Sequence, residues 1–200
     1  MNRVGVSAVV LAAGRSTRMG RDKALLPLGE HTALARVMAA CRQAGAEGVV
    51  VVVAPKATAI RAAALALDAR VAVTADQAAG PIASLKAGLG EVPGDPAGVL
   101  VFPVDHPLVQ AATVTALVQA LAEDRRRQVL FPRHAGRRGH PVLLGHGVLD
   151  EVLALPRDAT LRAVTLRDEA RNHDVDVDDP WAVADLDTPA DYQRALQALA

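Results

Sequence analysis

The chain has 200 residues, of which 51% are hydrophobic and only 2% aromatic, and its acidic and basic side chains balance to zero net charge. This length predicts one domain, residues 1–200, with enough apolar residues for a substantial core. The neutral balance and the scarcity of aromatic side chains argue against a protein that binds nucleic acid or an anionic membrane.

The single cysteine and the N-terminus bear on where the protein works. Cys41 lies in an apolar helical pattern, which predicts a buried, unreactive thiol rather than a disulfide or a thiolate metal site. The first residues show no signal peptide, and no apolar run approaches the roughly 18 residues that span a bilayer. We therefore expect a cytoplasmic protein with neither membrane nor nucleic-acid partners.

Apolar, β-branched segments alternate with Ala- and Leu-rich helical patterns along the first two thirds of the chain. The predicted strands are 4–11, 48–54, 70–74, 97–105 and 128–132, and the predicted helices are 31–45, 57–67, 80–92 and 112–124. Continuous apolar strands separated by helices are typical of a parallel sheet buried on both faces. The expected fold is α/β, a three-layer α/β/α arrangement around a Rossmann-like, mostly parallel sheet.

The last third of the chain has a looser pattern. Turn-forming and cationic residues dominate 133–145, and we expect no regular element there. Further on we expect helices at about 147–155 and 159–168, two short strands within 173–187, and a final helix over 188–200. Thr188 is the expected N-cap of that helix, with Pro189 at its first position and Asp191 completing a capping box.

The loop that follows the first strand has the composition of an anion-binding loop. Gly14 and Gly20 allow close backbone approach, and Arg15, Arg18 and Lys23 would surround the anion. Its spacing fits neither G-x-G-x-x-G nor G-x-x-x-x-G-K-[ST]. We favour a phosphate-binding loop over a solvated surface loop, because the cations directly follow a buried strand.

Carboxylates at the ends of later strands suggest a metal site. In open α/β sheets the ligand lies beyond the carboxyl ends of the strands, where Asp105 is expected. Asp105 is either a turn former or a ligand for Mg²⁺ bound to phosphates. Asp185 or Asp187, in an acidic segment, could share that metal. His106 is interpreted as a surface histidine at a turn.

The segment "GRRGHPVL" at 136–143 has two possible roles. Arg137, Arg138 and His140 could contact the phosphate of a second substrate, or the segment could be a plain exposed loop. The residues of the segment favour neither interpretation.

Several motifs together resemble a known family. They are "LAAGRSTRMGRDKALLPLG", "GPIASLKAGL", "VFPVDHPLV", "GRRGHPVLLG" and "DLDTPAD". With them the chain resembles the MobA-like nucleotidyltransferases and is most similar to the molybdenum cofactor cytidylyltransferase branch. The resemblance implies Mg²⁺-dependent transfer of a nucleoside monophosphate from CTP or GTP to a molybdopterin-type phosphomonoester, with release of pyrophosphate. It also implies a possible partner, a molybdoenzyme or its maturation chaperone.

The resemblance assigns roles to residues of this chain. Arg18, Lys23 and Asp105 would be catalytic, and Mg²⁺ would be held by Asp105 with Asp187 as a weaker second ligand. The implied nucleotide contacts are Leu11, Ala12, Ala13, Gly14, Arg15, Lys23, Asp76, Gly80, Pro81, Ser84 and His140.

The base preference rests on small residues. Ala13 stands where guanylyl members tend to have glycine, which narrows the space for a purine and favours CTP over GTP. The motifs "GRDKALLPLG" and "GPIAS" lean towards the guanylyl branch, whereas "LAAG" and "GHPV" lean towards the cytidylyl branch. Thr74 and Asp76 occupy a region where cytidylyl members usually carry Asn. The alternatives are a guanylyltransferase, a transferase for another phosphorylated molecule, and a non-catalytic carrier of molybdenum cofactor. A Rossmann dehydrogenase is excluded by the missing G-x-G-x-x-G.

Overall fold

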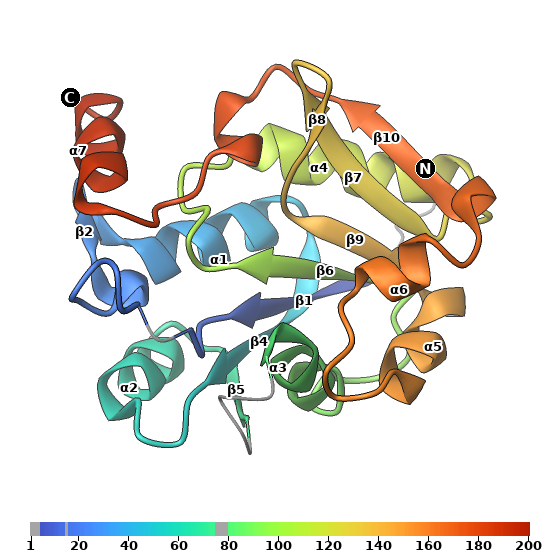
Figure 1. Ribbon diagram of the computed structural model, residues 1–200, viewed down its shortest axis with the longest axis horizontal. Helices are drawn as coiled ribbons and strands as arrows, with labels where there is room; N and C mark the ends of the chain where they lie inside the picture. The colour runs from blue at the N-terminus through green and yellow to red at the C-terminus, as the bar shows by residue number, and fades with distance from the viewer. Residues whose placement is uncertain (1–4, 15, 75–79) are drawn as a thin grey trace.

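The computed structural model describes residues 5–14, 16–74 and 80–200, and its centre is a mostly parallel sheet (Figure 1). Within the described residues the sheet has eight strands in the order β10-β7-β9-β6-β1-β4-β5, and β8 pairs with β7. The strands are β1 (Val6–Leu11), β4 (Ala46–Val53), β5 (Arg70–Val73), β6 (Gly98–Pro103), β7 (Val129–His134), β8 (Arg137–Arg138), β9 (Val142–Gly145) and β10 (Asn172–Asp176). A separate hairpin pairs β2 (Pro27–Leu28) with β3 (His31–Thr32).

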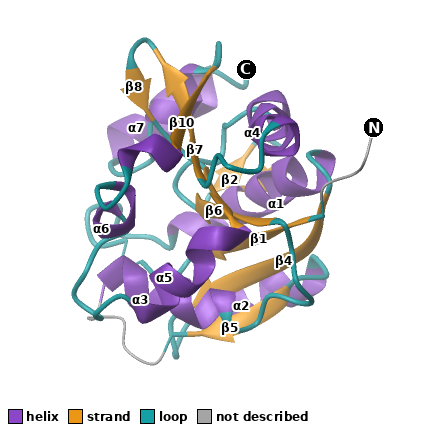
Figure 2. Ribbon diagram, turned by 90° about the vertical axis from the view of Figure 1, so that its right-hand side faces the viewer, coloured by secondary structure: helices purple, strands orange, loops and turns teal. Residues whose placement is uncertain are grey.

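Helices cover both faces of this sheet, as the side view shows (Figure 2). One face carries α1 (Ala33–Gln43), α2 (Thr58–Ala66) and α4 (Ala111–Glu123), and the other carries α3 (Gly80–Leu89), α5 (Leu149–Ala154) and α6 (Arg162–Thr165). The remaining helices are α7 (Pro189–Gln197) and the short 3₁₀ helices η1 (Lys23–Leu25), η3 (His146–Val148), η4 (Glu169–Arg171) and η5 (Pro180–Val183). The expected three-layer fold is confirmed. No described helix has the length and apolar content to cross a membrane.

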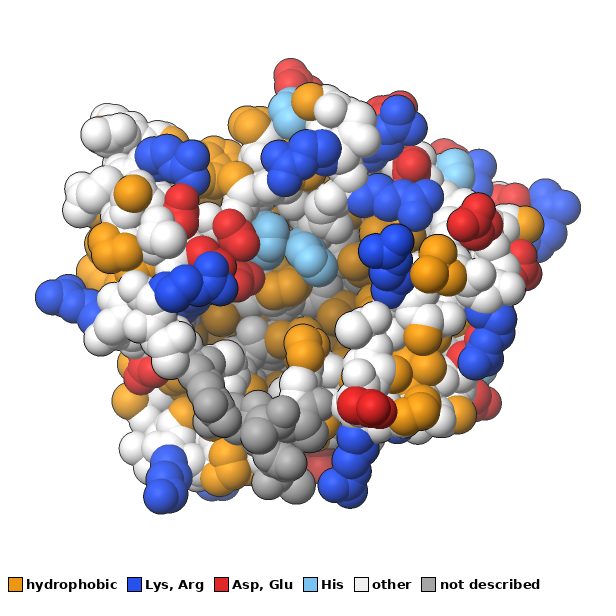
Figure 3. Space-filling model, in the orientation of Figure 1, with side chains coloured by type: hydrophobic (Ala, Val, Ile, Leu, Met, Phe, Trp, Pro, Cys, Tyr) orange, Lys and Arg blue, Asp and Glu red, His pale blue; other side chains and the backbone are white. Residues whose placement is uncertain are grey.

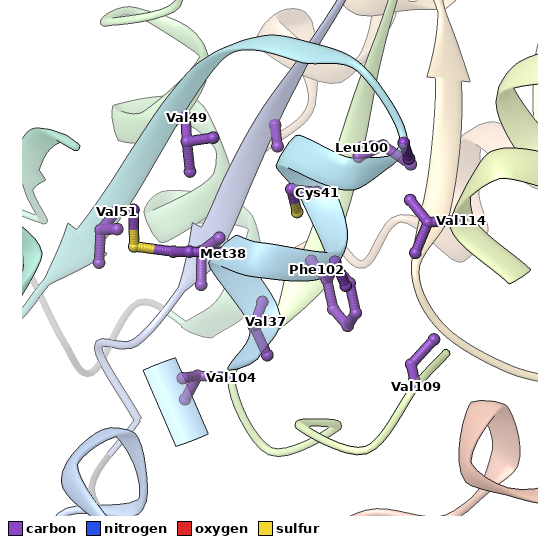
Figure 4. Close-up of a cluster of buried hydrophobic side chains, with 14 of the residues drawn as sticks. Val37, Met38, Cys41, Val49, Val51, Leu100, Phe102, Val104, Val109 and Val114 are labelled. Carbon is purple, nitrogen blue, oxygen red and sulfur yellow. The ribbon is translucent and has the colours of Figure 1, made fainter. Parts of the chain in front are cut away.

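The valine run of β4 explains why the sheet is covered twice. Val49 and Val51 point into the core beneath α1, while Val50 and Val52 point into the core beneath α3. Alternate side chains of a strand face opposite sides of the sheet, so an unbroken apolar run requires helices on both faces. Figure 4 shows the first of these cores. Cys41 is fully buried there, and burial raises the pKa of its thiol to about 12, which confirms the expected unreactive thiol.

Two segments differ from the sequence-based expectation. The stretch 133–145 holds the end of β7, all of β8 and the fully buried β9, which pairs antiparallel with β6 and with β7. Strand β9 has only four residues, all apolar or small, and the turn-forming residues on either side make so short a strand hard to predict from the sequence. Within 173–187 the first predicted strand is β10, but the second is the 3₁₀ helix η5, because Asp179 caps it and Pro180 begins it.

The C-terminal helix begins as expected. The Thr188 hydroxyl accepts from the Asp191 backbone N–H, and the Asp191 carboxylate accepts from the Thr188 N–H at 2.7 Å, which completes the capping box. Buried Ala195 packs α7 against Leu28 and Leu186, so this helix is fixed to the hairpin β2–β3.

Gly88 offers a test of the packing between α3 and the sheet. A Cβ added at Gly88 would lie 2.4 Å from a methyl of Val9 and 2.8 Å from a methyl of Val52. We expect Gly88→Ala to lower the free energy of unfolding by about 1–3 kcal/mol, because the added methyl group would overpack the core. Gly90→Ala is the matched control, since its Cβ would meet only ordinary contacts at 3.6 Å or more. Urea unfolding measures both; equal stabilities of the two variants would contradict this packing.

Candidate active site

Two adjoining cavities open at the carboxyl ends of β1 and β6. These strands are parallel neighbours in register, so Leu11 at the end of one lies beside Pro103 at the end of the other. Each cavity measures about 280 Å³, and both are lined by Leu11, Gly14, Pro103 and Asp105. Figure 3 shows the hollow on this face, with acidic, basic and histidine side chains along its rim.

The loop after β1 turns back towards the sheet within a few residues. Ser16 has a positive φ of 47°, and its carbonyl oxygen accepts from the N–H groups of Met19 and Gly20. The Ser16 hydroxyl accepts from the Lys23 N–H at 3.3 Å. Buried Ala24 then anchors η1 in the core. The loop therefore returns Lys23 to the end of the strand that it left.

The Lys23 ammonium is shared by two carboxylates. Its Nζ donates to Asp187 and lies 3.5 Å from Oδ2 of Asp105. Arg18 also pairs with Asp187, at 2.5 Å from the other carboxylate oxygen. The three predicted catalytic residues and the predicted second metal ligand thus form one network of two cations and two anions.

The charges of this network differ in their surroundings. Hydrogen bonding to Lys23, followed by the nearby charges of Lys23 and Arg18, holds the pKa of Asp187 below its ordinary value against burial and Asp191. Oδ1 of Asp105 is buried and has no hydrogen-bond partner within the described part of the chain. A buried carboxylate oxygen without a partner is costly, so this atom is a ready ligand for a bound cation.

The segment before α7 brings Asp187 to this edge. The N–H of buried Leu186 donates to the carbonyl oxygen of Asp105 at 2.8 Å, and the Asp187 N–H donates to Asp191 at 3.2 Å. Asp185, which directly precedes Leu186 in the sequence, is exposed. Of the two aspartates left open by the sequence, the structure brings Asp187 to Asp105.

Two histidines lie next to Asp105. His106 is buried, so the prediction of a surface histidine is wrong; its Nε2 lies 4.0 Å from Asp105 Oδ1, and its Nδ1 lies 3.5 Å from the Trp181 carbonyl oxygen. The ring centroids of His106 and His140 are 4.8 Å apart. Burial, with His106 as a secondary cause, lowers the pKa of His140 to about 4, against the opposing charge of Asp105. His140 is therefore a neutral imidazole at pH 7.

The neighbours of His140 have structural contacts. A Cβ at Gly139 would lie 2.1 Å from the Ala182 carbonyl oxygen, so only glycine fits where this turn crosses η5. Arg138 stacks on the Phe131 ring at 4.6 Å and pairs with Asp174 at 2.5 Å. The structure therefore separates the elements of this motif: His140 lies beside His106 and Asp105, whereas Arg138 is bound to strand β10.

The second cavity collects most of the predicted nucleotide contacts. Besides the shared residues it is lined by Ala13, Gly80, Pro81 and Ser84, while Ala12 lines the first cavity with Arg18 and Lys23. Two further predicted contacts, Arg15 and Asp76, lie outside the described residues.

Sequence reasoning missed several residues around the site. Thr17 and Ile60 line the first cavity. Buried Asp179 accepts hydrogen bonds from the Thr113 hydroxyl at 2.7 Å, the Gln110 N–H at 2.8 Å and the Trp181 N–H at 3.0 Å. Asp179 thereby fixes η5, whose carbonyl groups contact the His106 ring and accept from the His140 backbone N–H. The Asp-Pro pair at 179–180 was a usable signal for a helix start.

The residues present fit a divalent cation bound together with a nucleotide. Among the described residues, no group of three or more His, Cys, Asp or Glu side chains could hold a metal ion. Mg²⁺ in nucleotide sites needs only one or two carboxylates, since phosphates and waters complete its shell. Asp105 and Asp187 supply that pair, because both contact one ammonium group.

His140 gives the site a testable pH dependence. Its pKa is about 4 in the fold and 6.5 ordinarily, so between these values the unfolded chain binds the extra proton. Stability should therefore fall as pH drops through this window, by about 2 kcal/mol between pH 6.5 and 5. Urea unfolding of His140→Gln should show a flatter pH dependence over this range than the unchanged protein.

The control for this experiment is His31→Gln, because His31 is exposed. That variant should retain the full pH dependence of the unchanged protein. An equally steep loss of stability in His140→Gln would contradict the assignment to His140.

Comparison with known proteins agrees with this geometry. Residues 8–175 match the model of the MobA-like NTP transferase domain. A probable molybdenum cofactor guanylyltransferase of Opitutus terrae is 31% identical over 96% of each chain. A nucleotidyl transferase from Methanothermobacter is 26% identical, with a TM-score of 0.83 over 98% of this chain and 97% of that one.

A second solved structure contains a metal. Rv0371c of Mycobacterium tuberculosis H37Rv, in complex with manganese, is 28% identical with a TM-score of 0.76, over 97% of this chain and 99% of that one. The family match covers most of the chain, so the family expected from the motifs is confirmed. The expected cytidylyltransferase branch is not supported, because the relative from Opitutus terrae is named a guanylyltransferase. The chain belongs to the MobA-like NTP transferase family and is a nucleotidyltransferase.

Proposed function

We propose that this protein transfers GMP from GTP to the phosphate of a molybdopterin-type acceptor and releases pyrophosphate. The observation that carries the proposal is the Lys23 ammonium shared by Asp105 and Asp187 beside the second cavity, which forms an apolar recess at the strand ends. The relative from Opitutus terrae, named a probable molybdenum cofactor guanylyltransferase, supports the choice of donor and acceptor. The reaction would take place in the cytoplasm, within one domain over residues 1–200.

In the proposed reaction a phosphate oxygen of the acceptor attacks the α-phosphorus of GTP. A new P–O bond forms, the bond between the α-phosphorus and the bridging oxygen breaks, and the electron pair leaves with pyrophosphate. Arg18 and Lys23 would neutralise the charge that grows on the leaving group. No protein nucleophile is needed, which agrees with the unreactive, buried Cys41.

A divalent cation, which we propose to be Mg²⁺, would be held by Asp105 and Asp187. When bound, it supplies positive charge that neutralises the triphosphate and polarises its oxygens. Support comes from the unpartnered Oδ1 of Asp105 and from the manganese complex of the mycobacterial structure.

The apolar recess would hold the base. Buried Ala13 lines it together with Gly80 and Pro81. From Ala13 the sequence favoured CTP, but the curated relative is named a guanylyltransferase, and we give its similarity over nearly the whole chain more weight than one methyl group. The proposed order of preference is therefore GTP before CTP.

His106 lies beside Oδ1 of Asp105, whereas Lys23 lies beside Oδ2. We place the acceptor near His106 and its neighbour His140. A neutral His140 can accept or donate one hydrogen bond without repelling a cation. A different phosphorylated acceptor would leave the chemistry unchanged, because acceptor pockets differ in their loops. The product would pass to a molybdoenzyme or its maturation chaperone.

A panel of nucleotides tests the proposal. Protein, Mg²⁺ and molybdopterin are incubated with ATP, CTP, GTP or UTP, and pyrophosphate release is measured. We expect the highest kcat/KM with GTP. A higher value with CTP would overturn the assigned base, and no release with any nucleotide, together with no thermal stabilisation by GTP and Mg²⁺, would favour the non-catalytic carrier.

The same assay tests the carboxylates. Asp105→Asn and Asp187→Asn should each lower kcat by about 10²–10³, the usual cost of removing one group that stabilises transition-state charge. The matched control is Asp185→Asn, because Asp185 lies two positions from Asp187 but is exposed. Equal losses in the Asp185 and Asp187 variants would contradict the assignment of Asp187.

A further inference from the structure

The Lys23 ammonium already occupies one oxygen of each carboxylate that would hold a cation. It contacts Oδ1 of Asp187 and lies 3.5 Å from Oδ2 of Asp105, and its side chain is only 13% exposed. Arg18, in contrast, is 72% exposed and contacts the other oxygen of Asp187. Lys23 is thus the enclosed cation of the network, and Arg18 lies at its rim.

A divalent cation held by both Asp105 and Asp187, with the free Oδ1 of Asp105 among its ligands, would share both carboxylates with the ammonium. Positive charges at contact distance repel strongly, and a partly enclosed site weakens solvent screening. A divalent cation alone balances the charge of the two carboxylates, whereas the ammonium does so only together with Arg18. The site therefore has two alternative occupants, of which one is permanently attached to the chain.

The chain allows Lys23 to move while its backbone stays in place. Ala24 is 2% exposed in the core and the Lys23 N–H is held by Ser16, so the backbone is anchored on both sides. The four-carbon side chain of Lys23 lines the first cavity, into which it can turn by rotamer changes.

We propose that Lys23 is an exchangeable counter-ion: it holds the cation site in the nucleotide-free protein and moves to the phosphates when nucleotide and metal enter. The metal would then bind weakly alone and tightly with nucleotide, and the coupling would be reciprocal. This inference rests on the divalent cation of the proposed function, but on neither its base nor its acceptor.

Binding of Mn²⁺ alone, without nucleotide, tests this exchange. Free Mn²⁺ is counted by its electron paramagnetic resonance signal during titration of the protein. We expect Lys23→Met to bind Mn²⁺ at least tenfold more tightly than the unchanged protein, because the competing charge is gone. Lys23→Arg keeps the charge and should bind as weakly as the unchanged protein. Lys56→Met is the matched control, since Lys56 is exposed and outside both cavities.

Two further variants keep the test decisive. Lys23→Gln replaces Lys23→Met if the latter fails to fold by circular dichroism, and the same gain is expected. The double variant Lys23→Met with Asp187→Asn should lose the gain, which places the bound ion at these carboxylates.

Equal Mn²⁺ affinity of the unchanged protein and a folded, uncharged Lys23 variant would overturn the exchange. A gain that survives the Asp187→Asn change would also overturn it, because the ion would then bind elsewhere. Failure of GMP transfer in the nucleotide panel would overturn the proposed substrates but would leave the predicted Mn²⁺ affinities unchanged, so the two failures are distinguishable.

Discussion

The structure of the site depends on one interaction, the Lys23 ammonium shared by Asp105 and Asp187. Its partners lie 82 and 164 residues away in the sequence, so the interaction requires the whole fold. The parallel pairing of β1 and β6 brings two of these residues to one edge of the sheet, and the hydrogen bond from Leu186 to Asp105 brings the third. Without the ammonium, two partly enclosed carboxylates would face each other, which is unfavourable unless another cation replaces it. This constraint links the stability of the nucleotide-free protein to the chemistry proposed for it.

The sequence predicted those parts of the molecule that depend on local pattern. The valine run of β4 required a sheet covered on both faces, and Thr188 with Asp191 marked the start of α7. Strand β9 was missed because its burial comes from β6 and β7 on either side rather than from its own length. His106 was misplaced for a similar reason: η5, far away in the sequence, covers it. The choice between Asp185 and Asp187 likewise needed the contact of Leu186, which no local pattern reveals.

The fold and the charged network indicate the type of reaction more closely than they indicate its substrates. Cations and carboxylates beside a cavity suit any transfer at the α-phosphorus of a nucleotide, and this fold hosts many acceptors. In our proposal the recess around Ala13 and Pro81 selects the base, and the surface near His140 selects the acceptor. For the choice of base and acceptor, the proposal therefore rests on similarity over the whole chain. The neutral His140, next to the charged network, lies where we propose that the acceptor binds.

The most direct test of this account is a crystal structure with Mn²⁺ and a non-hydrolysable GTP analogue, in which anomalous scattering locates the metal. We expect the metal at Asp105 and Asp187, with the Lys23 ammonium on the phosphates and the base between Ala13 and Pro81. A metal bound elsewhere, with Lys23 still joined to both carboxylates, would contradict it.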